Sequence, residues 1–222
     1  MINIAIDGPA GAGKSTIAKN VAKNLGYIYV DTGALYRTVG LYVLRKKFDT
    51  KNAETVTSLL KEMKVELKFI NGTQRVYLNG EDVSEEIRTP EASMAASNVS
   101  AISSVRNFLF ALQQDIAQNN NCIMDGRDIG TVVLPNAQVK IFLTASVEER
   151  AKRRYLELVD KGMKVVFEDV IEEMKQRDYQ DSHRKIAPLR PAQDAVILDT
   201  TNESLQQVLS DIEIIVEEKT HG

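Results

Sequence analysis

A glycine-rich segment near the start of the chain limits its fold more than any other feature. Residues 8–15 read Gly-Pro-Ala-Gly-Ala-Gly-Lys-Ser, which fits the pattern G-x-x-x-x-G-K-[ST] at every fixed position. The segment lies between an apolar run at residues 2–7, typical of a buried strand, and apolar residues at helical spacing that end at Gly26. Because glycine allows a tight turn, such a loop can wrap a phosphate with its backbone N–H groups.

This loop predicts a binding site for a nucleoside triphosphate. The helix that begins near Lys14 directs the positive end of its dipole at a bound anion. Lys14 can reach the β- and γ-phosphates, and the Ser15 hydroxyl can ligate Mg²⁺. The predicted triphosphate-binding residues are consecutive: Gly8, Pro9, Ala10, Gly11, Ala12, Gly13, Lys14, Ser15 and Thr16.

The rest of the chain alternates strand and helix patterns, which predicts an α/β fold. The order strand, helix, strand over the first 30 residues marks a βαβ unit, and parallel strands require such crossovers. Further apolar runs predict core strands at residues 27–30, 122–125, 139–145 and 195–199. Helical patterns occupy residues 33–47, 53–63, 103–118, 147–160, 167–179 and 204–217, and Pro90 opens another helix.

Residues 65–78 interrupt this pattern. Two runs of alternating apolar and polar residues, 65–70 and 75–78, are separated by a segment that begins with Asn71-Gly72. This dipeptide is typical of a tight hairpin turn. We therefore expect an antiparallel hairpin, in a small insertion that packs beside the main sheet.

Charge and cysteine content limit the partners and the compartment. The formal net charge of -3 offers no basic field for nucleic acid, although arginines can still gather locally around a small anion. Cys122 is the only cysteine and is expected to be buried at the start of a strand, so an intrachain disulfide is ruled out. No apolar run is long enough to span a bilayer. We expect a cytoplasmic monomer that binds neither nucleic acid nor membrane.

Two arginines follow predicted strands. Arg37 ends the segment Asp-Thr-Gly-Ala-Leu-Tyr-Arg after the strand at 27–30, and Arg127 lies in Asp-Gly-Arg-Asp after the strand at 122–125. Both are expected to come from loops at the carboxyl-end edge of the sheet, where open α/β sheets bind ligands. Two guanidinium groups at this edge predict an anion between them.

Two charged helical segments carry further clusters, whose spacing places their members on shared helix faces. The residues concerned are Arg150, Arg153, Arg154, Arg177, Asp181 and Arg184. Spacing alone is more often typical of a solvated surface held by ion pairs than of a site, so both interpretations stay open at this point.

The chemistry of a phosphate acceptor suits converging arginines. A phosphomonoester has a second pKa of about 6, so it is largely dianionic at neutral pH. Such a nucleophile needs no general base, but it needs positive charge before a second anion can approach. The sequence contains no evident Ser-His-Asp or Cys-His set that would indicate other chemistry.

Across nearly its whole length the sequence resembles the bacterial cytidylate kinases. The resemblance rests, in order and spacing, on residues 8–16, 31–37, 80–87, 125–131 and 177–184. Asp-Gly-Arg-Asp-Ile-Gly-Thr at 125–131 and Gly-Glu-Asp-Val-Ser at 80–84 are more specific than the phosphate loop.

This resemblance implies the fold of a nucleoside monophosphate kinase. That fold is a P-loop NTPase of three α/β/α layers with a five-stranded parallel core sheet, an insertion that binds the monophosphate and holds a small antiparallel β element, and a helical lid. The single unit 1–222 would divide into a core (1–36, 103–146 and 186–222), an insertion (about 37–102) and a lid (about 147–185).

The resemblance also implies an activity, the ATP-dependent phosphorylation of CMP and dCMP to CDP and dCDP with Mg²⁺. Arg37 and Arg127 would hold the phosphate of CMP, with Thr32 close by. Arg177 and Asp181 would contact the sugar.

The remaining roles implied by the resemblance concern the base and the donor. Ser97, Arg106 and Asp128 would bind cytosine with help from Arg184. The lid residues Arg150, Arg153 and Arg154 would close over the ATP phosphates. The implied catalytic residues are Lys14, Arg37, Arg127 and Arg153.

Two alternatives remain at this stage. One is a P-loop kinase that phosphorylates a hydroxyl group, in which Asp31 would act as a general base. The other is a nucleotide-dependent switch, but the guanine-recognition motif Asn/Thr-Lys-x-Asp is missing from the sequence.

Overall fold

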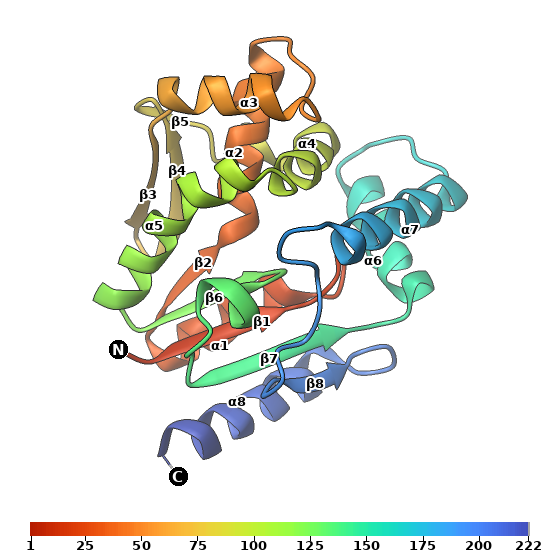
Figure 1. The fold of residues 1–222 in the computed structure, drawn as a ribbon. Coiled ribbons are helices and arrows are strands. Elements are labelled where there is room, and N and C mark those ends of the chain that lie inside the picture. Colours follow the sequence, from red (N-terminus) through yellow and green to blue (C-terminus); the bar gives the residue numbers. More distant parts are fainter. Residues whose placement is uncertain (222) are drawn as a thin grey trace.

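Five parallel strands form the central sheet of the protein, whose computed structural model describes residues 1–221. They are β1 (Asn3–Asp7), β2 (Ile28–Asp31), β6 (Cys122–Gly126), β7 (Val139–Thr144) and β8 (Val196–Asp199). Their order is β2-β6-β1-β7-β8, which puts β1 in the middle (Figure 1). All five predicted core strands are confirmed: β1, β6 and β7 are largely buried and recognisable as apolar runs, and the edge strand β8 is apolar although it is more exposed.

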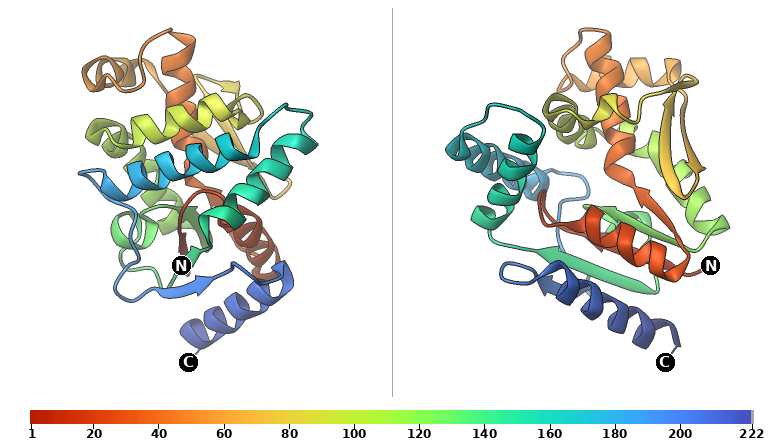
Figure 2. Two further views of the ribbon diagram at one scale, coloured as in Figure 1. Left: turned by 90° about the vertical axis from the view of Figure 1, so that its right-hand side faces the viewer. Right: turned by 180° about the vertical axis from the view of Figure 1, so that it is seen from behind.

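Helices cover both faces of this sheet. On one face α1 (Lys14–Leu25) and α8 (Leu205–His221) pack on side chains such as Ile4, Ile6 and Ile141. On the other face α5 (Ser103–Asn119) and a π-helical turn, η3 (Ile129–Val133), pack on Ala5 and Met124. In both views of Figure 2, α8 lies on the side of the sheet away from the insertion. The predicted three-layer arrangement is confirmed, whereas η3 was not predicted.

The insertion follows β2 and has its own hydrophobic core. It contains α2 (Thr32–Arg45), α3 (Ala53–Leu59), the 3₁₀ turns η1 (Leu60–Glu62) and η2 (Glu86–Arg88), and α4 (Pro90–Ser100). Its core also includes Val105 and Leu109 of α5, while Ile116 and Ala117 of the same helix pack on the sheet. Helix α5 therefore joins the insertion to the central sheet.

The predicted antiparallel hairpin is present within the insertion. Strands β3 (Val65–Ile70) and β4 (Thr73–Leu78) pair around Asn71 and Gly72, whose φ angles of 51° and 74° are those of the expected tight turn. A short third strand, β5 (Glu81–Asp82), pairs with β4 and was not predicted. Asn79 and Gly80 form the second turn with similar positive φ angles.

Two charged helices, α6 (Val147–Asp160) and α7 (Phe167–His183), form the predicted lid segment. Their shared core is small, with Ala151, Leu158, Val170 and Met174 as its buried residues. They lie to the right of the insertion in Figure 1, and α7 contacts α4. Because so little apolar surface fixes them, these helices are the part of the molecule best suited to move.

Three predicted helices have different ends in the structure, and one of them, expected at 204–217, continues to His221. The helix expected at 53–63 ends at Leu59 and continues as the 3₁₀ turn η1. The helix expected to end at residue 179 extends to His183, whose ring stacks on Tyr179 with centroids 4.0 Å apart.

Two sequence-based expectations bear on the molecule as a whole. The division into core, insertion and lid stays a prediction, and residue 222 of the predicted core lies outside the described residues. A search of residues 1–221 finds no helix with the length and apolar character needed to cross a bilayer.

Candidate active site

The glycine-rich loop joins the central strand β1 to α1, and its backbone requires glycine at two points. A Cβ at Gly8 would lie 2.0 Å from the carbonyl oxygen of Leu143 in β7. Gly13 has a φ of 86° and precedes α1 as its N-cap, with no side chain to occupy the free N–H groups. The helix terminus is therefore open to an anion.

Lys14 is buried beside this loop, where its Nζ donates to the carbonyl oxygen of Pro9 at 2.7 Å. The pKa of Lys14 is lowered to about 7, first by burial and next by the charge of Arg127, against the opposing effect of Asp125. A nearby polyanion would restore the ammonium form. Lys14 is thus placed to gain charge when phosphates arrive.

Ser15 and Asp125 together offer oxygen ligands of the kind that Mg²⁺ prefers. The Ser15 hydroxyl donates to Asp125 Oδ2 at 2.7 Å, and the Tyr29 hydroxyl donates to Oδ1 at 3.1 Å. Burial, and then the charge of Asp31, raise the pKa of Asp125, so a cation beside it would relieve an unfavourable charge. Asp125 was not among the candidate ligands named from sequence, although its place at the end of the strand beside the phosphate loop is a usable signal.

A metal at this point would need ligands from outside the protein. Across residues 1–221 there is no group of three or more His, Cys, Asp or Glu side chains that could hold a metal ion. Mg²⁺ commonly keeps waters and binds substrate phosphates, so one hydroxyl and one carboxylate fit it.

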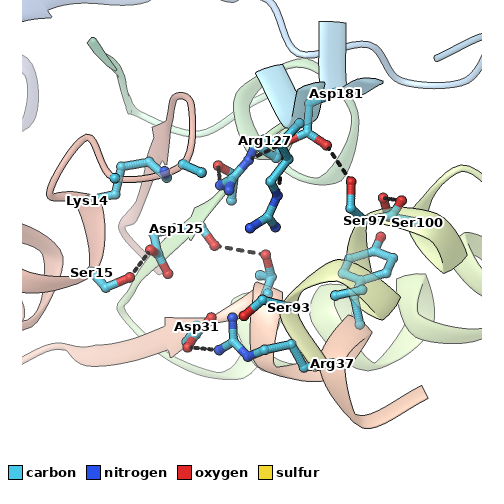
Figure 3. Close-up of a pocket in the computed structure, with 18 of the residues that line it drawn as sticks. Lys14, Ser15, Asp31, Arg37, Ser93, Ser97, Ser100, Asp125, Arg127 and Asp181 are labelled. Atoms are coloured by element: carbon cyan, nitrogen blue, oxygen red, sulfur yellow. Dashed lines mark hydrogen bonds and ion pairs between the residues drawn. The ribbon is translucent and has the colours of Figure 1, made fainter. Parts of the chain in front are cut away.

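A cavity of about 660 Å³ opens from the phosphate loop toward the insertion and the lid. This volume is in the usual range for a small-molecule site. Figure 3 shows side chains from separate segments converging here, with Lys14 and Ser15 on one side and Arg37 and Arg127 facing them. The lining includes every substrate-binding residue predicted from sequence: Thr32, Arg37, Ser97, Arg106, Arg127, Asp128, Arg177, Asp181 and Arg184.

Arg37 lies in α2, which confirms the helix predicted at 33–47 and not the loop from which Arg37 was expected to come. One of its terminal nitrogens donates to Asp31 Oδ2 at 2.6 Å, and its buried Nε has no hydrogen-bond partner among the described residues. Asp31 also caps α2 by accepting from the Ala34 N–H at 2.9 Å. This cap fixes the start of the helix and therefore the direction of the Arg37 side chain.

Arg127 reaches the cavity from the loop after β6, as predicted. Its Nε donates to Asp181 Oδ2 at 3.0 Å, and another nitrogen donates to the Gly126 carbonyl at 3.0 Å. Arg177 of α7 approaches the same Asp181 oxygen, with 4.0 Å between Nε and Oδ2. Although burial alone would raise it, the pKa of Asp181 is held below its ordinary value by Arg127 and Arg177.

The positively charged side chains of this cavity repel one another. Burial lowers the pKa of Arg177 to about 10, and the positive charge of Arg127 lowers it next. Arg37 and Arg154 act in the same direction. The lining of the cavity carries eleven Lys and Arg side chains against six Asp and Glu side chains, so the cavity is complementary to an anionic ligand.

The end of the cavity away from Lys14 is a network of hydrogen bonds around Asp128. Arg106 pairs with Asp128 Oδ2, and Arg184 donates to Oδ1 at 3.1 Å. The same two arginines also bond Ser100, one at its carbonyl and the other at its hydroxyl. The Tyr36 ring lies against Arg106, with 5.7 Å between the ring centroid and the guanidinium carbon. This end offers several fixed polar atoms in a buried setting.

The three predicted lid arginines are placed differently. Arg153 and Arg154 line the cavity. Arg150 lies outside the lining and is buried, and its nitrogens donate to the Ala145 and Ala10 carbonyls and to Asp178. Arg150 therefore ties α6 to the phosphate loop and to α7, and its contact with ATP stays a prediction.

The other predicted residues of the phosphate loop also fall into two groups, those that line the cavity and those that do not. Ala10, Gly11, Gly13 and Thr16 line the cavity, whereas Gly8, Pro9 and Ala12 lie behind it and shape the loop. Side chains that the sequence analysis missed also line it: Lys19, Tyr36, Arg88, Gln113, Asp125 and Lys161. Most of these belong to helices whose sequence pattern is equally typical of a surface.

Comparison with known proteins bears directly on this arrangement. A sequence model of the family described as "Cytidylate kinase" matches residues 4–218. The chain belongs to the cytidylate kinase family. It is 54% identical over 211 residues to a cytidylate kinase of Caldicellulosiruptor saccharolyticus, covering 95% of this chain and 93% of the relative.

Two further comparisons agree with the family and the fold. A cytidylate kinase of Ligilactobacillus salivarius is 52% identical over 220 residues, covering 99% of this chain and 98% of the relative. A solved structure of an uncharacterized protein from Eubacterium ventriosum has a TM-score of 0.52 at 12% identity, with 98% and 99% of the two chains covered. The latter supports the fold alone.

Proposed function

We propose that this protein transfers the γ-phosphoryl group of ATP to CMP and dCMP, forming ADP and CDP or dCDP. Family membership supports this activity, and one observation in the structure is its main physical support. Lys14, Arg37, Arg127 and Arg177 come from four separate segments and share one cavity, in which burial and then the charge of Arg127 lower the pKa values of Lys14 and Arg177. Such a cavity accommodates two anionic substrates end to end.

The donor phosphates would bind at the glycine-rich loop and the N-terminus of α1. Lys14 would stabilise charge on the β- and γ-phosphates, and the lid arginines Arg153 and Arg154 would approach from the opposite side. Ser15 and Asp125 would hold a Mg²⁺ ion, which when bound neutralises phosphate charge. Closure of α6 and α7 would exclude water that would otherwise hydrolyse ATP.

The acceptor phosphate would bind between Arg37 and Arg127, with the Thr32 hydroxyl close by. Thr32 donates to the Asp125 carbonyl at 2.8 Å, which fixes the side chain at the edge of the sheet. The phosphate oxygen is already an anion and needs no proton removed. The role of these cations is therefore to let the two anionic substrates approach each other and to orient them. Lys14, Arg37, Arg127 and Arg153 would together stabilise the transferred group.

The pyrimidine base would bind at the far end of the cavity, against Ser97, Arg106, Asp128 and Arg184. Cytosine presents an exocyclic amine and an unprotonated ring nitrogen, which a carboxylate and a guanidinium complement. Uracil reverses both, and each buried polar group left unpaired costs roughly 1–3 kcal/mol. The sugar would lie near Arg177 and Asp181.

Phosphorylation of a hydroxyl group is not favoured, because Asp31 is a poor general base. Its two carboxylate oxygens accept from the Ala34 N–H and from Arg37. Although burial acts to raise it, Arg37 holds the pKa of Asp31 below its ordinary value. An efficient base needs a pKa near the working pH.

Location and assembly belong to the same proposal. We infer a cytoplasmic monomer of pyrimidine nucleotide metabolism that acts on small molecules and binds neither nucleic acid nor membrane. The net charge of -3 and the single, buried Cys122 are in keeping with this inference.

A panel of acceptors at fixed ATP and Mg²⁺ tests the proposal. ADP formation should be fast with CMP and dCMP, slower with UMP, and at the hydrolysis background with shikimate or another alcohol. Mass spectrometry should identify the product as the nucleoside diphosphate. Phosphorylation of alcohols in preference to nucleoside monophosphates would refute it.

A further inference from the structure

Gln113 of α5 carries a buried polar atom that the proposed function leaves unused. The residue is 1% exposed and lines the cavity. Its Nε2 donates to the Leu109 carbonyl at 3.0 Å, whereas its Oε1 has no hydrogen-bond partner among the described residues. A buried acceptor without a donor is unfavourable, so its presence in a cavity points to a ligand that supplies the donor.

The orientation of the Gln113 amide follows from its neighbour. The Leu109 carbonyl can only accept a hydrogen bond, so the amide nitrogen must face it. Exchanging nitrogen and oxygen would set two oxygens against each other. The free atom is therefore the carbonyl oxygen, and this group seeks a donor.

Gln113 belongs to the base end of the cavity. It lies two helical turns from Arg106 on the same face of α5. It also contacts Tyr36: burial raises the pKa of Tyr36, Arg106 acts to lower it, Asp128 to raise it, and a hydrogen bond donated by the Gln113 side chain acts to lower it. Tyr36, Arg106, Asp128 and Gln113 are thus neighbours around one region of the cavity.

The other acceptor identified in this region already has donors. Asp128 accepts from Arg106 at one oxygen and from Arg184 at the other. A ligand amine must compete with two guanidinium groups for Asp128, whereas Gln113 Oε1 has no such competitor in the part of the chain that the structure describes.

We propose that Gln113 is a specificity-determining residue, whose Oε1 accepts a hydrogen bond from the exocyclic amine of an aminopyrimidine. The inference rests on the proposed function and adds to it a group that selects the base. A uracil ring would place a carbonyl oxygen against Oε1, and the two acceptors would repel each other.

Three ribonucleotide acceptors and two variants test this proposal. The acceptors are CMP, UMP and the CMP analogue that carries hydrogen in place of the amine, pyrimidin-2-one ribonucleoside 5′-monophosphate. The test variant is Gln113→Met, which keeps the length of the side chain but removes the acceptor. The control is Gln114→Met, the same change at the next residue of α5, whose amide bonds the Val133 carbonyl.

In Gln113→Met, kcat/KM should fall about tenfold for CMP and stay within about twofold for the analogue without an amine. The preference for CMP over the analogue therefore falls about tenfold, while the KM for ATP is unchanged. Gln114→Met should keep the wild-type preference whatever happens to its stability. A wild-type preference in Gln113→Met would overturn the proposal, because Tyr36 or water would then be the partner of Oε1.

A measurement on the wild-type protein covers the case in which the variant does not fold. The ¹³C resonance of the Gln113 side-chain carbonyl should move on addition of CMP and stay in place with the amine-free analogue at saturation. Equal movement with both ligands would overturn the proposal. Failure of the wild-type protein to phosphorylate CMP would instead refute the proposed function, so the two outcomes are distinguishable.

Discussion

At the residue scale, this site is a set of buried charges that are unfavourable until substrates bind. Lys14 and Arg177 both have lowered pKa values, first because they are buried and next because Arg127 is close to each. Asp125 and Asp7 have raised pKa values, mainly from burial. The charges of Lys14, Arg177 and Asp125, which line the cavity, are stabilised when a ligand of opposite charge arrives, so part of the binding energy comes from relieving them.

The lowered pKa of Lys14 predicts that nucleotide binding is coupled to the uptake of a proton. Its pKa of about 7 in the ligand-free protein leaves it mostly neutral at pH 8, and bound phosphates restore the charged form. Calorimetry of ATP binding at pH 8 in buffers of different ionisation enthalpy should therefore report uptake of about one proton. The uptake should decline below pH 7.

The matched control for this measurement is Lys14→Arg, because arginine stays charged throughout this range. Its binding enthalpy should not depend on the buffer. An enthalpy for the wild-type protein that is the same in every buffer at pH 8 would contradict the assignment.

The raised pKa of Asp7 predicts that the stability of the fold depends on pH. Its carboxylate accepts from the Ile129 and Gly130 N–H groups at 2.8 and 2.7 Å, and burial raises its pKa from 3.8 to about 6. The folded state therefore holds this proton more tightly than the unfolded state. Stability from Asp7 is present in full below pH 4 and is lost as the pH rises through 6, by about 3 kcal/mol in total.

Urea unfolding of the wild-type protein and Asp7→Asn between pH 4 and 7 checks this prediction. From pH 4 to pH 7 the unfolding free energy of the wild-type protein should fall by about 2 kcal/mol relative to that of Asp7→Asn. Two curves that run parallel would show that Asp7 titrates normally.

At the scale of elements, helices α2 and α4 position the acceptor site by packing closely together. Gly40 of α2 makes this contact, since a Cβ there would lie 2.8 Å from the Cβ of Ala95 and 3.1 Å from its carbonyl carbon. Helix α4 carries Ser97, whose hydroxyl donates to Asp181 of α7 at 3.5 Å. The spacing of these two helices thus sets the position of a group that is proposed to bind the base.

Gly40→Ala is expected to weaken acceptor binding more than donor binding. Overpacking costs about 1–3 kcal/mol, and alanine returns about 1 kcal/mol through its helix propensity. Displacement of α4 should raise the KM for CMP several-fold and leave the KM for ATP nearly unchanged, because the phosphate loop belongs to β1 and α1. Steady-state kinetics with each substrate varied in turn provides the measurement.

The double variant Gly40→Ala with Ala95→Gly removes the Cβ that the new side chain meets. It should recover part of the lost CMP affinity. A double variant no better than the single one would show that the helix spacing is not what limits binding.

The same scale shows why the elements were more predictable than the site. Buried parallel strands such as β1 are apolar throughout, so the sequence pattern indicates them directly. The π-helical turn η3 has no such pattern, because the Asp7 carboxylate holds it from 122 positions away in the chain. Arg150 and Arg153 look alike in sequence, yet the rotation of α6 buries one and turns the other to the cavity. Gln113 is a glutamine in an amphipathic helix, a pattern typical of a surface position.

At the scale of the whole molecule, the insertion and the helices α6 and α7 meet over the phosphate site on the central sheet. The central sheet fixes the loop at Lys14, the insertion carries Arg37 and Ser97, and α6 and α7 carry Arg153, Arg177 and Asp181. The lid helices share only a small buried core. Ligands that contact several parts at once should therefore hold them together.

Hydrogen exchange tests this view of the lid. A bisubstrate analogue that joins cytidine and adenosine through phosphates should slow amide exchange across residues 147–183. Amides of β1 and β6 should be unaffected, because they are already protected by the sheet. If amide exchange in α6 and α7 does not change when the analogue is added, these helices do not act as a lid.

The central claim is that guanidinium groups facing Lys14 accept the phosphate of a second substrate. Its most direct test is kcat/KM for CMP and for cytidine in the wild-type protein, Arg37→Met and Arg127→Met. We predict that cytidine is not phosphorylated and that each variant loses about 100-fold in kcat/KM for CMP while its KM for ATP changes little. Phosphorylation of cytidine at a rate near that of CMP, or variants as active as the wild-type protein, would contradict the account.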